Sequence, residues 1–181
     1  SNPVVNITPI AIEDTSPVTD QPAKSWRYFS VDIPTNALGW DLRVVDVSSG
    51  SPQLVVRRGN WPTTAVTTPG WSSSANHWPS NNQWVAKLDW TRRKNSPAGS
   101  DESGRVMAMG MGHPLEPGTY FIGVTNASTT AASYTLRSRG IGDSNFFSIP
   151  VIELPYTGVL SNSFLPAREA AYYRVQVPSN A

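Results

Sequence analysis

The sequence contains no cysteine, which excludes disulfide bonds, thiolate chemistry and cysteine-ligated zinc. Blocks of like charge are also lacking, since 14 Lys and Arg residues nearly balance 13 Asp and Glu residues and leave a net charge of +1. Without a basic run to neutralise phosphates, we expect no nucleic-acid partner. No apolar run approaches the roughly 18 residues of a membrane-spanning helix, so we expect no membrane insertion.

The sequence also lacks helical periodicity, whereas turn-forming residues are frequent. The chain has 16 prolines and 13 glycines, and together with Ser, Thr and Asn they recur about every eight to twelve residues, a spacing typical of sandwiches and barrels. We therefore predict an all-β fold, a jelly-roll-like antiparallel β-sandwich without substantial helix. The predicted strands are residues 4–12, 26–33, 38–47, 53–58, 83–90, 105–111, 119–126 and 133–139, with 13–23 as a turn-rich linker.

One stretch of the sequence occurs twice. Residues 22–37, PAKSWRYFSVDIPTNA, return without gaps as residues 166–181, PAREAAYYRVQVPSNA, at an offset of 144. A repeat of this period is a whole domain, because solenoid units span only about 20 to 50 residues. We therefore predict one complete domain, residues 1–145, followed by the first strands of a second, incomplete copy, residues 146–181.

The order of several motifs resembles the bacterial pre-peptidase C-terminal domain family, here in tandem. The motifs are YFSVDIP from Tyr28, LVVRRG from Leu54 with Pro62-Thr63, PGTYFIGV from Pro117, and Tyr134-Thr135-Leu136. Together they span roughly residues 26 to 138. The resemblance implies a jelly-roll-like sandwich that acts as an accessory module, with roles in export, surface attachment or binding of collagen or polysaccharide, and no reaction of its own.

Residues 64–104 are longer and richer in Trp than the corresponding connection in that family. Indole rings stack on sugar faces and other flat ligands, so this region is a candidate platform for a polysaccharide or a protein. The alternative is that the rings anchor a long loop onto the sandwich, since buried Trp is common. The candidate binding residues are Trp61, Trp71, Trp78, Trp84, Trp90, His77 and Asn82.

Acidic residues near the start could hold calcium, which takes six to eight oxygen ligands. The candidates are Glu13, Asp14 and Asp20, although no EF-hand loop pattern is present. The alternative is that they are solvated turn residues. No other cofactor is expected.

The tail carries apolar strands that have no sheet of their own in the predicted domain. Phe146, Phe147, Ile149, Tyr172 and Val175 are therefore candidates for self-association with a neighbouring copy. The alternative is that the rest of the second domain lies outside this sequence.

Catalytic patterns are absent: the sequence has neither a Gly-x-Ser-x-Gly elbow nor a His-Glu-x-x-His pair. We therefore predict a non-enzymatic module of a secreted or cell-surface bacterial protein, a spacer and adhesive or substrate-binding unit. Its expected partners are an extracellular polysaccharide, a matrix protein or copies of itself. Two alternatives remain open: a filament subunit whose C-terminal strands complete a neighbour, and an appended domain of a secreted hydrolase.

Overall fold

The computed structural model describes residues 4–66, 82–86, 105–110, 115–161, 164–166 and 169–181, and of residues 105–109 it describes the backbone alone. Every regular element in these ranges is a strand, so they include no helix that could cross a membrane. The strands are β1 (Ile7–Ile10), β2 (Asp14–Gln21), β3 (Trp26–Ile33), β4 (Gly39–Ser49), β5 (Pro52–Arg58), β6 (Gln83–Val85), β7 (Arg105–Gly110), β8 (Gly118–Asn126), β9 (Ala132–Gly142), β10 (Ile149–Leu154) and β11 (Tyr172–Val175).

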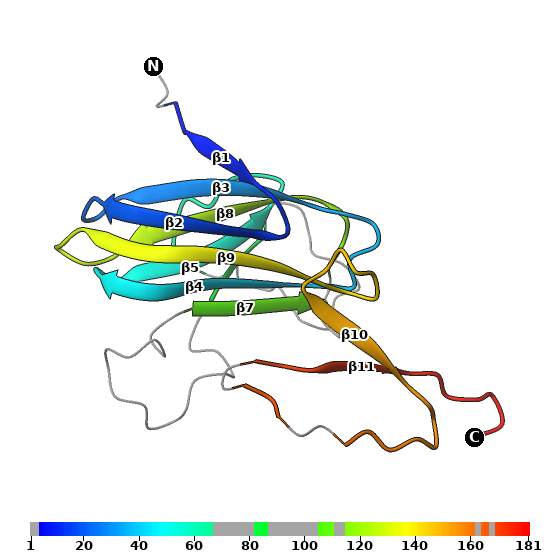
Figure 1. Cartoon of the computed structure of the whole chain (residues 1–181). Helices are drawn as coiled ribbons and strands as arrows, with labels where there is room; N and C mark the ends of the chain where they lie inside the picture. Colours follow the sequence, from blue (N-terminus) through cyan, green and yellow to red (C-terminus); the bar gives the residue numbers. More distant parts are fainter. Residues whose placement is uncertain (1–3, 67–81, 87–104, 111–114, 162–163, 167–168) are drawn as a thin grey trace.

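The strands form two sheets that pack face to face (Figure 1). One sheet has the order β1-β3-β8-β5-β6, and the other has the order β11-β10-β9-β4-β7 with β2 also paired to β9. The predicted all-β sandwich is confirmed. Most pairs are antiparallel, as expected, but β1–β3, β9–β10 and β10–β11 are parallel.

The core lies between the two sheets. In β3, Phe29, Val31 and Ile33 alternate toward it and are buried, because successive side chains of a strand point to opposite faces. Trp40 of β4 is fully buried, and its indole Nε1 donates to Ser138 Oγ at 2.9 Å. A satisfied indole N–H removes the cost of burying a polar group inside the sandwich.

The segment predicted as a turn-rich linker is instead a strand. Residues 14–21 form β2, which pairs antiparallel with β9. The sequence is polar, but Val18 and Gln21 face inward and are buried. The Gln21 amide is satisfied there, since Nε2 donates to the carbonyl oxygen of Val124 at 3.0 Å and Oε1 accepts from the Tyr134 hydroxyl at 2.7 Å.

The tail extends the second sheet. At the end of β9, Ile141 and Gly142 pair in parallel with Ile149 and Pro150 of β10. β11 then pairs with β10, so the tail has a place on the sheet of its own chain (Figure 1).

Candidate functional site

Of the Trp group, the structure describes two members. Trp84 of β6 is half-buried and packs against the core, which is the anchor role. Trp61 is also half-buried, and its carbonyl oxygen accepts from Arg57 Nη1 at 3.2 Å. Asn82 uses its backbone carbonyl to accept from the Arg58 N–H at 3.3 Å. The other predicted binding residues, Trp71, Trp78, Trp90 and His77, lie outside the described residues, so the platform stays a prediction.

Two of the three calcium candidates use their carboxylates in other hydrogen bonds. Glu13 Oε1 accepts from the backbone N–H of Gly140 at 2.7 Å and of Ser148 at 3.1 Å. Asp14 accepts from the Thr15 N–H at 2.7 Å, and the Asp20 N–H donates to Ser133 Oγ at 3.1 Å. The described residues contain no group of three or more His, Cys, Asp or Glu side chains placed to hold a metal ion.

Glu13 therefore has a structural role that the sequence did not reveal. Its carboxylate joins Gly140 at the end of β9 to Ser148, which directly precedes β10. This contact fixes the connection between the sandwich and the tail, because hydrogen bonds to a charged acceptor contribute roughly 1.5–3 kcal/mol each.

Two of the five predicted self-association residues are buried within the chain. Phe147 is buried in the main core cluster, and Ile149 is buried against Ile141. Phe146 and Val175 are exposed, and Tyr172 is half-buried. The self-association itself stays a prediction.

The parallel pair β10–β11 has the same register as the parallel pair β1–β3. Ile7 pairs with Tyr28 in the first, and Val151 pairs with Tyr172 in the second. Both partners are displaced by 144 residues, the offset of the sequence repeat. In this register Thr8 is the equivalent of Ile152.

The contact between the sandwich and the tail, which we call the joint, has an apolar part and a charged part. In the apolar part, Ile149 and Val151 are each 7% exposed and cluster with the fully buried Ile141. Tyr172 packs against this cluster from β11. Burial raises the pKa of the Tyr172 hydroxyl, and the nearby charge of Asp41 raises it further.

The charged part lies on the outer face of β4 and β9. Arg43 binds Asp41 through two parallel contacts, Nε to Oδ1 at 2.8 Å and Nη2 to Oδ2 at 2.9 Å. From β9, Arg139 Nη2 contacts Asp41 Oδ1 at 3.0 Å. Asp41 and Arg43 are both buried although they point away from the core between the sheets.

Glu169 of the tail completes this network. Its Oε2 contacts Arg139 Nη2 at 2.9 Å and Arg43 Nη2 at 3.4 Å, and its Oε1 lies 3.8 Å from Arg137 Nη2. Burial lowers the pKa of Arg139, but the hydrogen bonds and charges of Glu169 and Asp41 outweigh it and raise that pKa above its ordinary value. Burial lowers the pKa of Arg137, and the charges of Arg139 and Arg43 lower it further. Glu169 thus brings a negative charge to a face where three arginines surround one aspartate.

Comparison with known proteins adds one likeness. No family model matches the sequence, and no curated protein sequence matches it. Among solved structures, the chain is similar to the pre-peptidase C-terminal domain of a collagenase from Bacillus anthracis. The alignment has 11% identity and a TM-score of 0.42, and it covers 76% of this chain and 98% of that chain. At this identity and TM-score the likeness does not establish family membership.

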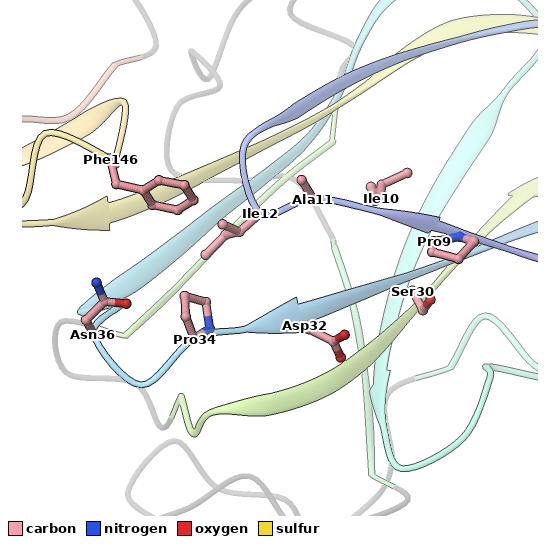
Figure 2. Close-up of a pocket in the computed structure, with 9 residues that line it drawn as sticks. All are labelled: Pro9, Ile10, Ala11, Ile12, Ser30, Asp32, Pro34, Asn36 and Phe146. Atoms are coloured by element: carbon pink, nitrogen blue, oxygen red, sulfur yellow. The ribbon is translucent and has the colours of Figure 1, made fainter.

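A shallow cavity of about 520 Å³ lies beside β1. Its lining includes Ile10, Ile12, Asp32 and Pro34, and Phe146 projects toward it from the connection that follows β9 (Figure 2). Asp32 is the one charged residue among the described residues that line it, and Asp32 Oδ1 already accepts from Thr119 Oγ1 at 2.6 Å. The cavity is therefore mostly apolar, with no convergent set of polar groups among its described lining residues.

Sequence reasoning missed the charged part of the joint. Asp41 and Arg43 alternate with Trp40 and Leu42, so the pattern places them on a solvent-facing side. The tail covers that side, and the residue pattern of a single strand cannot indicate this contact. The signal that could have found them is the opposite charges on β4 and β9, which the topology places next to each other, together with Glu169 in the segment before β11.

Proposed function

We propose that this chain is a non-catalytic module of a tandem array in a secreted or cell-surface protein. Residues 1–145 form one copy, and residues 146–181 are the opening strands of the next. Each copy acts as a spacer that holds the following copy in a fixed relation to itself. The observation that carries the proposal is the common register of β1–β3 and β10–β11 at an offset of 144 residues.

The exposure of the tail supports this proposal. Val175 of β11 is 41% exposed, whereas its equivalent in β3, Val31, is fully buried. Val177 is also exposed, whereas its equivalent Ile33 is buried. Large exposed apolar side chains mark a surface that is covered in the functional state. The tail therefore exposes the residues whose equivalents face the core in the first copy.

The two alternatives differ in what the tail does. In a filament, the tail of one molecule would complete the sheet of another, and residues such as Phe147 and Ile149 would be needed between molecules. In this chain both side chains are buried against the first copy, which favours the array. The appended domain of a secreted hydrolase is compatible with the array, because a catalytic domain could be joined to either end.

The adhesive or substrate-binding role is a separate part of the proposal and depends on the Trp group. Trp71→Ala or Trp78→Ala should abolish retention on an insoluble polysaccharide or on collagen without lowering the melting temperature. If both substitutions instead unfold the protein, these rings are anchors and the binding role is wrong.

The array is tested by completing the second copy. Since Ala181 is equivalent to Ala37, residues 38–145 can be fused directly after Ala181. We expect the extended chain to fold as two sandwiches. Its urea unfolding should then expose about one and a half times the surface of the original chain, and the denaturant dependence of the unfolding free energy should rise in proportion.

A matched substitution separates a folded second copy from an unstructured extension. Val175→Asp should leave the 181-residue chain stable, because this side chain is exposed there. In the extended chain the same change should unfold the second copy, since it places a charge in the new core. A disordered extension, or equal tolerance of Val175→Asp in both chains, would overturn the proposal.

A further inference from the structure

The parallel strand β1 is two residues shorter than its equivalent β10. β10 runs over Ile149–Leu154, and β1 runs over Ile7–Ile10. The two extra residues of β10, Ile149 and Pro150, are the ones that pair with the end of β9. Their equivalents Val5 and Asn6 form no strand. β1 thus lacks the two residues that, in β10, pair with the end of β9.

The side chains that make the joint in the tail recur at the start of the chain. Ile149, Val151 and Tyr172 correspond to Val5, Ile7 and Tyr28, so each position keeps a β-branched or a tyrosine side chain. In the tail the two aliphatic residues are buried on Ile141, whereas Val5 and Ile7 are only half-buried. Tyr28 is half-buried as well and stacks parallel to Trp26 with ring centres 5.7 Å apart.

We infer that Val5, Ile7 and Tyr28 form a docking surface, the N-terminal ledge, for the β9 end of another copy of this domain. This inference rests on the proposed array and adds the contact by which a copy receives the one before it. The same contact already occurs once within this chain, where Ile141 and Gly142 pair with Ile149 and Pro150 of β10. The docked copy adds strand pairing at Val5 and Asn6 and covers the three side chains.

The placement of the two ends agrees with a head-to-tail contact. β1 and β11 lie on opposite sides of the molecule (Figure 1). One copy can therefore precede the sandwich while another follows it. A contact between different surfaces of identical units extends a chain of units instead of closing a dimer.

The two joints differ at two charged positions. Arg174 of the tail, whose Nη1 contacts Asp143 Oδ2 at 3.1 Å, is equivalent to Ser30. The residue equivalent to Glu169 is Ser25, whose Oγ donates to the Pro22 carbonyl oxygen at 2.7 Å. At the N-terminal ledge, Arg43 and Arg139 of a preceding copy would therefore have no carboxylate in the place of Glu169. The contact there should depend mainly on strand pairing and apolar burial, and so weaken less in salt than the joint made by the tail.

The test is a tandem protein in which residues 1–144 are fused ahead of the full chain, which preserves the 144-residue period. Because the sequence has no cysteine, Ile141→Cys in the first copy and Val5→Cys in the second create a single pair of thiols. Paired positions of neighbouring strands bring their Cβ atoms within reach of a disulfide. We expect rapid disulfide formation in the native protein and its loss in denaturant. Ile141→Cys with Ile149→Cys in the 181-residue chain is the positive reference.

Val4→Cys is the matched control, because Val4 adjoins Val5 and is 97% exposed. With Ile141→Cys held constant in the first copy, Val5→Cys should form the disulfide at least about tenfold faster than Val4→Cys, since only the former faces its partner across the strand pair. Equal rates in a protein whose two copies are both folded would overturn the inference and leave the proposed array standing. If the completed second copy of the earlier experiment does not fold, the proposed array is wrong. That result does not depend on the N-terminal ledge.

Hydrogen exchange on the cysteine-free tandem protein provides a second measurement if the cysteine variants fold poorly. The amides of residues 5–7 in the second copy should exchange at least about tenfold more slowly than in the 181-residue chain, because strand pairing protects them. Unchanged exchange at these amides would count against the inference to the same extent as equal disulfide rates.

Discussion

At the scale of single residues, Glu169 is the side chain by which the tail meets the charged face of the sandwich. Glu169→Gln keeps the shape of the side chain but removes the charge that contacts Arg43 and Arg139. Because Arg43 is buried, we expect the variant to lose about 1–3 kcal/mol of unfolding free energy. Urea unfolding of the full chain measures the loss, which should shrink as salt rises from about 0.05 M to 0.5 M.

Glu153→Gln is the control for that measurement. Glu153 also forms an ion pair, with Arg174, but both side chains are about half exposed. Exposed pairs contribute about 0–1 kcal/mol, so this variant should keep nearly the full unfolding free energy. Equal effects of the two substitutions would show that Glu169 acts as an ordinary surface charge.

Tyr134 gives the core a dependence on alkaline pH. Burial raises the pKa of its hydroxyl well above the ordinary value of 10.0, with a smaller opposing effect from Arg27. Above pH 10.0 the unfolded chain releases this proton and the folded chain keeps it, so the unfolding free energy falls with rising pH. One such group contributes a slope of about 1.4 kcal/mol per pH unit.

Tyr134→Phe should remove that contribution. We expect a less steep loss of stability between about pH 10 and pH 12, measured by urea unfolding at several pH values. At neutral pH the variant should be less stable by about 1–3 kcal/mol, because Gln21 Oε1 loses its donor. Tyr156→Phe, at an exposed position, is the control. An alkaline slope identical to that of the unsubstituted chain would contradict the assignment.

At the scale of elements, the end of β9 is shaped to receive the connection that follows it. The Phe147 ring lies against the backbone of two glycines, and a Cβ at Gly140 or at Gly142 would come within 2.2 Å of it. Gly142→Ala should therefore displace the ring and destabilise the chain by about 1–3 kcal/mol. The measurement is the unfolding free energy of the full chain.

A double-substitution cycle isolates the cause of that loss. Once Phe147→Ala has removed the ring, Gly142→Ala should cost little more, because the added Cβ then has free space. The two residues are in contact, so their effects should be far from additive. Additive effects would show that Gly142→Ala acts through the strand and not through the ring.

The elements also show how far the sequence could predict the fold. β3 was predicted at its observed bounds because Phe29, Val31 and Ile33 alternate and the strand is central. β2 was missed because its inward-facing Gln21 looks polar, and only the tertiary contacts with Val124 and Tyr134 explain its burial. Val18 is the one buried apolar residue of β2, so the strand has no apolar alternation to reveal it.

The candidate site was predicted only in part, for a similar reason. The sequence repeat indicated strands in the tail, and the apolar residues of the tail were recognised from their types. Which sheet receives the tail depends on Ile141, whose neighbours in space come from β10 and β11. The burial of Asp41 and Arg43 depends on the same packing, so a pattern along one strand could not show it.

At the scale of the whole molecule, the array and the filament predict opposite effects of removing the tail. In the array the tail covers the end of β9 within its own chain, so the full chain should remain monomeric at high concentration. Deleting residues 146–181 should uncover Ile141 and the unpaired edge of Gly142, and an open edge invites pairing between molecules. The truncated chain should therefore associate more than the full chain, as measured by light scattering after size-exclusion chromatography.

The filament predicts a polymerising full chain and a monomeric truncated chain, because the tail is then the donated element. The truncated chain offers a further distinction, since a peptide of residues 146–181 added to it should restore the monomer if β10 docks on β9. The same peptide with Ile149→Asp should fail, because this side chain is buried against Ile141 in the joint. If both peptides restore the monomer, the tail covers an apolar edge without specific contacts. The joint would then not fix the position of one copy relative to the next.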